Sequence, residues 1–362
     1  MLSRRLVGLG RRGRCLSAVP AFASPLSQTQ ALAHPVFVLS YPGSRVLSLA
    51  SPGTGNELGP AVTGALEHHL RSYESNETVS AVFFASRSPD VFSTSAQSSS
   101  RPNLASLGSF VTALSSFKKP TLAVYSGSVN GTGFAAFSTC KYLLGGPSLS
   151  LVSDELSQGK LPSAGFAFQF TKCGRHGVSL ARYLAVSQRE VRADELYNLG
   201  LLTHLVEDEA YVSLADALAH TIPPTNANDG AIVVESAIED LLDTMHVEET
   251  SLGDPLAHEA WDKLVLVPPN REDTKPRPDD ASEVAADLYD IRDDVLKCFG
   301  GTPEMAIKKL SEIDAAWARH AIEQLGKVDR NLLNSWWRIT ESVSFPGVKL
   351  ADILRQESVE AR

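Results

Sequence analysis

Strand-like apolar runs alternate with helical periodicity along the first half of the chain. Two short apolar runs flank a Tyr-Pro-Gly-Ser turn at 41–44, which predicts a β-hairpin over residues 36–50. Within residues 60–73, four large apolar residues share one helical face: Val62, Leu66, Leu70 and Tyr73. The run 79–85, which is apolar except for Ser80, is typical of a buried strand. The alternation continues to about residue 165 and predicts an α/β core.

The second half of the chain is helical in pattern after a polar interruption. Residues 266–282 are rich in proline and charge and predict a surface linker or insertion. We therefore expect a core over 36–265 and a helical C-terminal region over 283–362. Three sets of residues predict the helices there: Val284, Leu288, Ile291 and Val295 on one face; an N-cap at Thr302 continuing through Ile307, Leu310, Ile313 and Trp317; and the pair Trp336 and Trp337, expected as a core or interface anchor.

The N-terminus is basic, although the chain as a whole is acidic. No Asp or Glu precedes Glu57, and five arginines occur among the first residues: Arg4, Arg5, Arg11, Arg12 and Arg14. Such a start is typical of a mitochondrial transit peptide, which we expect over residues 1–30; a disordered basic tail is the alternative. Without those arginines, 28 basic residues face 42 acidic ones, so the net charge moves from −9 to −14. An acidic body does not attract nucleic-acid backbones, so we expect little direct RNA contact.

Cysteine and hydropathy patterns exclude other classes of protein. The four cysteines are scattered and form no CxxC pair, which argues against a zinc site or a disulfide framework and suits a reducing compartment. We see no apolar run in the sequence long enough to span a membrane. His68, His69 and His204 lack metal-ligand spacing, so we expect no metal site.

Candidate chemistry concentrates between residues 117 and 163. A strand-like run at 121–125 leads into a glycine-rich turn, Gly127 to Gly133, and a second strand-like run at 149–152 precedes Glu155. Thioester chemistry needs two backbone N–H donors aimed at the developing oxyanion and a positioned carboxylate. Glycines allow a close approach of the backbone to such a substrate.

From about residue 36 onward, this layout resembles the crotonase (enoyl-CoA hydratase/isomerase) superfamily, and most closely its 3-hydroxyisobutyryl-CoA hydrolase branch. The similarity also includes the Leu-Ala-Ser-Pro entry at 49–52 and the Gly-Leu-Leu-Thr-His-Leu-Val segment at 200–206. The resemblance implies a spiral of repeated ββα units. It also implies an oxyanion hole from the N–H groups of Ala96 and Thr132, and a catalytic Glu155 with a coenzyme A thioester as ligand. The loop glycines would be Gly127, Gly131 and Gly133.

Several positions depart from the family pattern. Thr132 replaces a glycine, whose backbone freedom a β-branched residue lacks. Ser163 stands where the hydrolase branch carries its second acid, and Ala135 stands where the hydratase branch carries its first glutamate. Glu155 is then at least as readily explained as a loop carboxylate that caps nearby N–H groups.

Two hypotheses remain open. The first, which the replacements favour, is a non-catalytic scaffold, by resemblance a structural component of the mitochondrial small ribosomal subunit in the matrix with ribosomal proteins as partners. The second is an active acyl-CoA thioester hydrolase in valine breakdown, in which Glu155 is the base or nucleophile. Fold resemblance alone does not decide between them.

Overall fold

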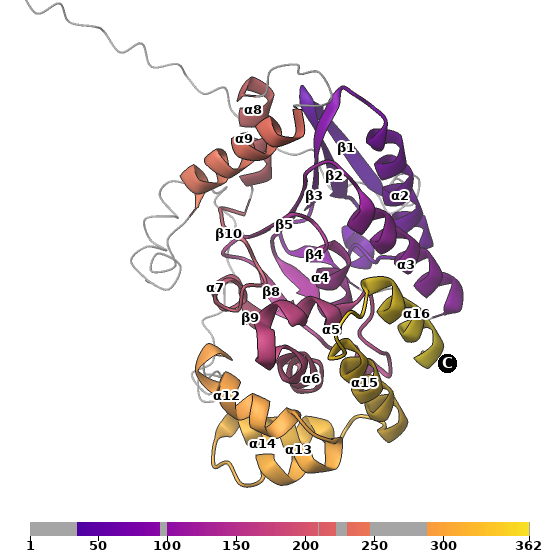
Figure 1. Cartoon of the computed structure of the whole chain (residues 1–362), viewed down its shortest axis with the longest axis vertical. Coiled ribbons are helices and arrows are strands. Elements are labelled where there is room, and N and C mark those ends of the chain that lie inside the picture. The colour runs from indigo at the N-terminus through magenta and orange to yellow at the C-terminus, as the bar shows by residue number, and fades with distance from the viewer. Residues whose placement is uncertain (1–34, 95–99, 209, 222–229, 247–287, 362) are drawn as a thin grey trace, which may run out of the picture.

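The computed structural model describes residues 35–94, 100–208, 210–221, 230–246 and 288–361 (Figure 1). The expected transit peptide, the linker 266–282 and Val284 lie outside these ranges, as does Ala96. Within them, no helix is both long and apolar enough to cross a membrane.

Two sheets form the α/β core. The larger has the strand order β1-β2-β3-β5-β7-β10, and the smaller has the order β4-β6-β8-β9. The strands of the larger sheet are β1 Val36–Tyr41, β2 Gly43–Leu49, β3 Val79–Ser86, β5 Thr121–Tyr125, β7 Tyr142–Gly145 and β10 His204–Leu205. Those of the smaller sheet are β4 Val91–Ser93, β6 Ser128–Asn130, β8 Ser150–Val152 and β9 Val191–Arg192. All neighbours are parallel except β1 with β2 and β8 with β9.

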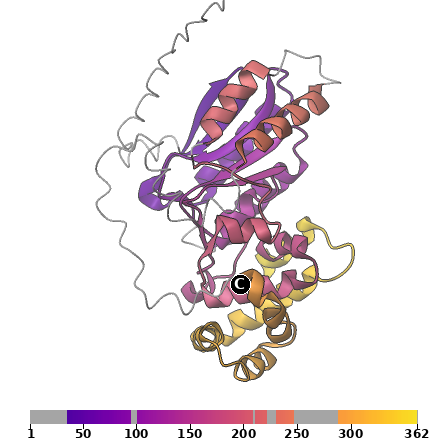
Figure 2. The same cartoon turned by 90° about the vertical axis from the view of Figure 1, so that its left-hand side faces the viewer.

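Helices cover both faces of the larger sheet (Figures 1 and 2). The helices of the core are α2 Pro60–Glu74, α3 Arg101–Ser116, α4 Gly131–Phe137, α5 Phe166–Gln169, α6 Gly177–Ser187, α7 Ala193–Asn198, α8 Ala210–Thr221 and α9 Gly230–Met245. Short 3-10 helices are η1 Pro52–Thr54, η2 Leu156–Gln158 and η3 Phe170–His176. Strand β3 is largely apolar because both of its faces are buried: Phe83 packs in the cluster that includes α8 and α9, and the next residue, Phe84, packs in the cluster on the other face.

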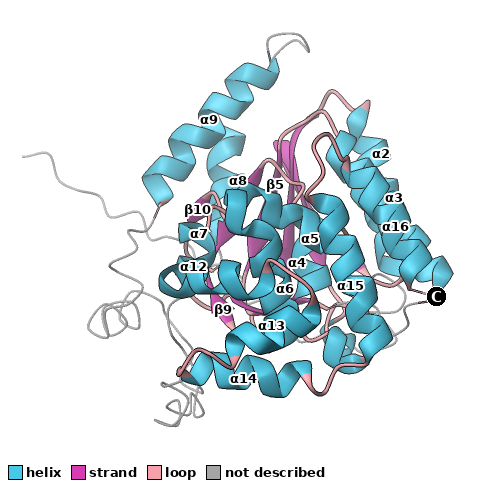
Figure 3. Ribbon diagram, turned by 60° about the horizontal axis from the view of Figure 1, so that its bottom comes forward, coloured by secondary structure: helices cyan, strands magenta, loops and turns pink. Residues whose placement is uncertain are grey.

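The helical C-terminal region packs against α5 and α6 at one end of the core (Figure 3). It consists of α12 Leu288–Phe299, α13 Pro303–Leu310, α14 Ala316–Leu325, α15 Arg330–Val343 and α16 Leu350–Glu360. Trp336 is buried in the core as predicted, with its ring centroid 6.2 Å from that of Phe166. The C-terminal helix α16 returns to pack on α3 and α15.

The predicted hairpin, the helix over 60–73 and the strand over 79–85 are confirmed, with all four expected apolar residues of α2 buried. The predicted N-cap is also confirmed, since the Thr302 hydroxyl accepts from the Met305 N–H at 3.3 Å. The prediction of one continuous helix from the Thr302 N-cap through Ile307 to Trp317 was wrong. Helix α13 ends at Leu310, and Ile307 is 41% exposed. Ser311 and Asp314 occur at the break, and residues of these types favour turns over helix interiors.

Candidate functional site

The glycine-rich segment is a short strand followed by a helix start rather than a plain turn. Strand β6 pairs with β4 and β8, and α4 begins directly after it at Gly131. Gly127 adopts a positive φ of +66°, and a Cβ there would lie 2.4 Å from the carbonyl carbon of Asp90. Only glycine meets both conditions, so this residue fixes where β6 enters the smaller sheet.

The start of α4 is held by side chains from neighbouring strands. The Asn130 side chain caps the helix by accepting the Gly133 N–H at 2.8 Å. A Cβ on Gly133 would lie 2.5 Å from the Ser93 hydroxyl at the end of β4. A Cβ on Gly131 would lie 2.8 Å from the Ser153 hydroxyl. The two glycines therefore allow β4 and the end of β8 to approach the helix start closely.

Glu155 is fully buried where β8 leads into η2. Its carboxylate accepts the Thr132 N–H at 2.6 Å through Oε1 and the Ser153 hydroxyl at 2.7 Å through Oε2. Burial raises the pKa of Glu155 above its ordinary value, although the hydrogen bonds from Ser153 and Thr132 oppose that rise. The structure brings the two predicted site residues Glu155 and Thr132 together and joins them by a direct hydrogen bond.

This bond bears on whether Thr132 can act as an oxyanion donor. An oxyanion-hole donor must point its N–H at the substrate oxygen. Here the N–H of Thr132 already donates to Glu155, so it is engaged by the protein's own carboxylate. The Thr132 side chain is engaged as well, because its hydroxyl accepts the Ser163 N–H at 3.0 Å. Both the N–H and the hydroxyl of Thr132 are thus hydrogen-bonded within the protein, the first to Glu155 and the second to the loop at Ser163.

Two of the replaced positions, Ser163 and Ala135, are buried in this fold. Ser163 is buried, and its hydroxyl donates to the Leu161 carbonyl at 3.0 Å. Ala135 is completely buried inside α4. The Ser93 hydroxyl, which borders Gly133, is buried and has no hydrogen-bond partner among the described residues. The first predicted donor, Ala96, lies outside the described ranges, so the oxyanion pair is described only at Thr132.

A second buried carboxyl escaped the sequence analysis. Glu357 on α16 accepts the Gly165 N–H at 3.1 Å through Oε1 and also bonds the Ala164 N–H. Burial raises its pKa from 4.5 to about 8. Ala164 and Gly165 both have positive φ, 61° and 77°, a conformation that Glu357 and the packing of Leu350 hold in place. The signal in the sequence was an acid four residues after Ile353, on the apolar face of a helix.

Titratable groups elsewhere do not gather into a metal centre. Within the described ranges, no group of three or more His, Cys, Asp or Glu side chains is arranged to hold a metal ion. His68 and His69 lie on α2, and His204 lies at the edge strand β10, with its ring centroid 5.9 Å from that of His246.

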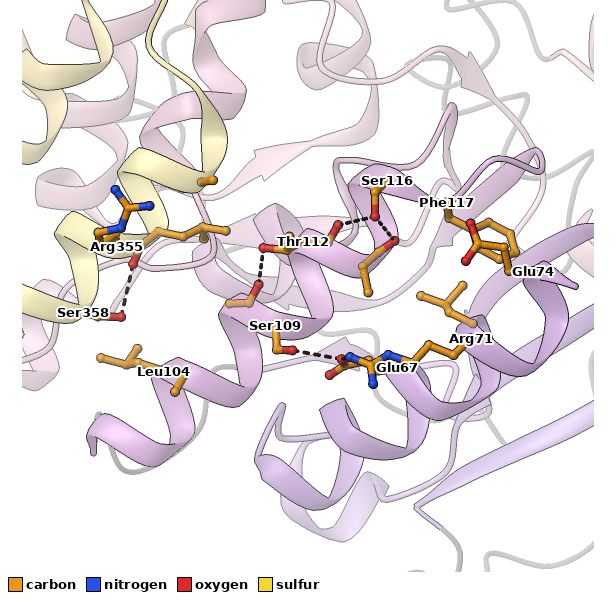
Figure 4. A pocket seen from close by; sticks show the side chains of 16 residues that line it. Glu67, Arg71, Glu74, Leu104, Ser109, Thr112, Ser116, Phe117, Arg355 and Ser358 are labelled. Carbon is orange, nitrogen blue, oxygen red and sulfur yellow. Dashed lines mark hydrogen bonds and ion pairs between the residues drawn. The ribbon is translucent and has the colours of Figure 1, made fainter.

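Two surface grooves lie away from Glu155. One, of about 600 Å³, runs along α3 between α2 and α16 (Figure 4). Its floor is made of small residues of α3, and Ser109 there donates to Glu67 of α2 at 2.9 Å. The other, of about 1150 Å³, lies between η3 and α6 of the core and the C-terminal helical region. Neither is lined by Glu155, Thr132 or Ser163.

Solved structures share this fold. A carnitinyl-CoA dehydratase from Mycobacterium thermoresistibile is 16% identical and superposes with a TM-score of 0.66, covering 90% of this chain and 84% of that one. An enoyl-CoA hydratase from Rhodobacter sphaeroides 2.4.1 is also 16% identical, with a TM-score of 0.59 over 90% of this chain and 83% of that one. At this identity the likeness establishes the fold and not the reaction.

Sequence comparison points to the same family. No curated protein matches the chain. The family model described as enoyl-CoA hydratase/isomerase matches residues 44–261, which is more than half of the chain. The chain therefore belongs to the enoyl-CoA hydratase/isomerase family, with the crotonase-like α/β fold and a helical C-terminal region.

Proposed function

We propose that this chain is a non-catalytic member of its family that resembles 3-hydroxyisobutyryl-CoA hydrolase and serves as a structural component of the mitochondrial small ribosomal subunit. The observation that carries its non-catalytic character is the bond between Glu155 and the Thr132 N–H, at 2.6 Å. In an active enzyme the Glu155 carboxylate would take part in the reaction and the Thr132 N–H would donate to the oxyanion. Here the two groups are hydrogen-bonded to each other instead.

Breaking the hydrogen bond between Glu155 and the Thr132 N–H would cost free energy. Glu155 is fully buried, and leaving a buried charged group without its hydrogen bonds costs several kcal/mol. Without the Thr132 donor, the transition state of a thioester reaction would lose about 3–4 kcal/mol. Ser163 adds to the loss, because it offers a hydroxyl where the hydrolase branch has a carboxylate.

The proposed location and the proposed kind of partner come from the sequence. An arginine-rich, acid-free start supports delivery to the mitochondrial matrix. The acidic body supports docking through protein partners with little direct contact to RNA. The proposal includes no resident cofactor. The ribosomal assignment itself rests on resemblance to a hydrolase-like ribosomal component.

An active acyl-CoA thioester hydrolase is the second candidate, and one observation favours it. Burial raises the pKa of Glu155, and a raised carboxyl pKa suits general acid–base catalysis. In this case a coenzyme A thioester would have to displace the Glu155 carboxylate from the Thr132 N–H.

One experiment with two arms separates the candidates. In the first, endogenous protein is sedimented from mitochondrial lysate with and without magnesium chelation; co-migration with small subunits, lost on chelation, supports the structural role. In the second, purified protein is assayed on 3-hydroxyisobutyryl-CoA beside Glu155→Gln and a neighbouring control, Asp154→Asn. Turnover that Glu155→Gln abolishes and Asp154→Asn preserves would overturn the non-catalytic proposal. Migration as a free small protein would overturn the ribosomal one.

A further inference from the structure

The C-terminal helix α16 inserts a buried carboxyl into the loop at residues 163–165. This helix packs on α3 and α15 and lies beside the core (Figure 1). Glu357 is only 3% exposed, and it accepts the Gly165 N–H at 3.1 Å through Oε1 and at 3.2 Å through Oε2. The Ala164 N–H also bonds to this carboxyl. These donors are backbone groups of one loop, so the docking of α16 and the conformation of the loop depend on each other.

The loop has a backbone conformation that Ala164 does not favour on its own. Its φ is +61°, which is uncommon for a residue with a Cβ, and Gly165 follows with a φ of +77°. Leu350, at the start of α16, packs so closely on Gly165 that a Cβ there would lie 2.4 Å from the Leu350 Cδ1. A strained backbone persists only where the surrounding structure holds it. Helix α16 supplies that support at two points, Glu357 and Leu350.

The same loop contacts the predicted oxyanion residue. The Ser163 N–H donates to the Thr132 hydroxyl at 3.0 Å, and the Thr132 N–H in turn donates to Glu155 at 2.6 Å. All three residues are buried, so a broken bond would leave a polar group without water to replace its partner. A continuous series of buried hydrogen bonds and adjacent residues therefore runs from Glu357 on α16 to Glu155.

We propose that α16 is a lock on the Thr132 site: its docking through Glu357 holds the 163–165 loop against Thr132 and keeps the site closed. Undocking of α16 lets Ala164 relax from its positive φ, withdraws the Ser163 N–H and opens the way to Thr132. The inference rests on the non-catalytic role proposed above, because it names the element that keeps the site closed. The loop is then a two-state element whose equilibrium α16 controls.

Amide hydrogen exchange tests the lock directly, because every donor in the series is a backbone N–H. Exchange would be followed on the full chain by mass spectrometry, with fragmentation that resolves single amides in segments 128–137 and 160–167. Glu357→Leu removes the acceptor and keeps an apolar side chain of similar size. Exchange of the Gly165 and Thr132 amides should accelerate roughly tenfold or more, because opening no longer breaks the Glu357 bonds. Glu357→Gln keeps an acceptor oxygen and should leave both rates nearly unchanged.

A matched control lies on the same helix. Glu360→Leu makes the same substitution at a carboxylate that bonds Arg338 instead of the loop. The exchange rates of the Gly165 and Thr132 amides should stay unchanged in this variant. Acceleration equal to that in Glu357→Leu would assign the effect to general loosening of α16 and would overturn the lock.

A second variant tests the coupling from the other end and decides the question if Glu357→Leu does not fold. Thr132→Val removes the hydroxyl that accepts from Ser163 and nearly conserves the side-chain volume. Coupling between two sites is reciprocal, so exchange of the Ala164 and Gly165 amides should accelerate in this variant. Unchanged exchange of those two amides would show that the site and α16 are independent.

The remaining outcomes for Glu357→Leu are equally decisive. Faster exchange at Gly165 with an unchanged Thr132 amide would separate α16 from the site, and unchanged exchange at both would remove the lock. Equal acceleration in the β1–β2 hairpin, residues 36–49, would show a general loss of stability instead. Failure of the lock is distinguishable from failure of the proposed function, since exchange is measured on purified protein and that function is tested by co-sedimentation and turnover.

Discussion

The buried carboxyl of Glu357 should make the stability of this protein fall as pH rises. In the folded state its pKa is raised from 4.5 to about 8, because burial disfavours the charged form. The folded protein therefore keeps a proton on Glu357 that the unfolded chain releases above pH 4.5. Stability from this group is complete below pH 4.5 and is lost progressively up to pH 8. Replacing Glu357 with Gln removes the ionisation while keeping an oxygen that can accept the Gly165 N–H.

The size of the effect follows from the two pKa values. A difference of roughly 3.5 in pKa corresponds to about 5 kcal/mol, which is an upper bound because partial opening of α16 would let water reach the carboxylate. We expect Glu357→Gln and the unchanged protein to be similarly stable near pH 4.5. The Gln variant should then gain by up to about 1.4 kcal/mol for each pH unit toward pH 8.

Urea denaturation followed by tryptophan fluorescence measures this difference. Trp336 and Trp337 lie on α15, which packs against α16, so their emission reports on this region. Unfolding would be followed at pH 5.0, 6.5 and 8.0. Glu360→Gln on the same helix is the control of opposite sign, because its bond with Arg338 lowers the pKa of Glu360. Parallel stability curves for Glu357→Gln and the unchanged protein would refute the reasoning.

Three further substitutions test the site and its surroundings by chemical denaturation. Gly127→Ala should cost at least about 1–3 kcal/mol, because its φ is positive and its Cβ would strike Asp90; a loss under 0.5 kcal/mol would contradict this account. Arg182→Met should cost about 1–3 kcal/mol, since it orphans the buried carbonyl of Phe299; an unchanged urea midpoint would count against it. Ser93→Ala should be neutral or about 1 kcal/mol stabilising, because its buried hydroxyl has no described partner; clear destabilisation would reveal one.

The sequence alone determined the elements whose signals are local. The hairpin of β1 and β2 and the buried strand β3 were predictable, because the patterns of apolar and polar residues that indicate them depend on neighbours along the chain. Gly127 was predictable as a turn residue for the same reason. The break after Leu310 was missed, because the apolar spacing continues through it while the polar residues there end the helix.

The tertiary structure decided what the candidate residues do. Resemblance to the family pointed to Glu155 and Thr132, but the bond between them joins residues 23 positions apart on two different elements. The contact of Glu357 with Gly165 spans 192 positions, and in sequence it is only an acid on an amphipathic helix. A carboxyl group can act as a base, cap backbone N–H groups or stay protonated in the core. Its solvent exposure and the hydrogen-bond donors around it decide which of these it does, and the packing of the folded chain sets both the exposure and the donors.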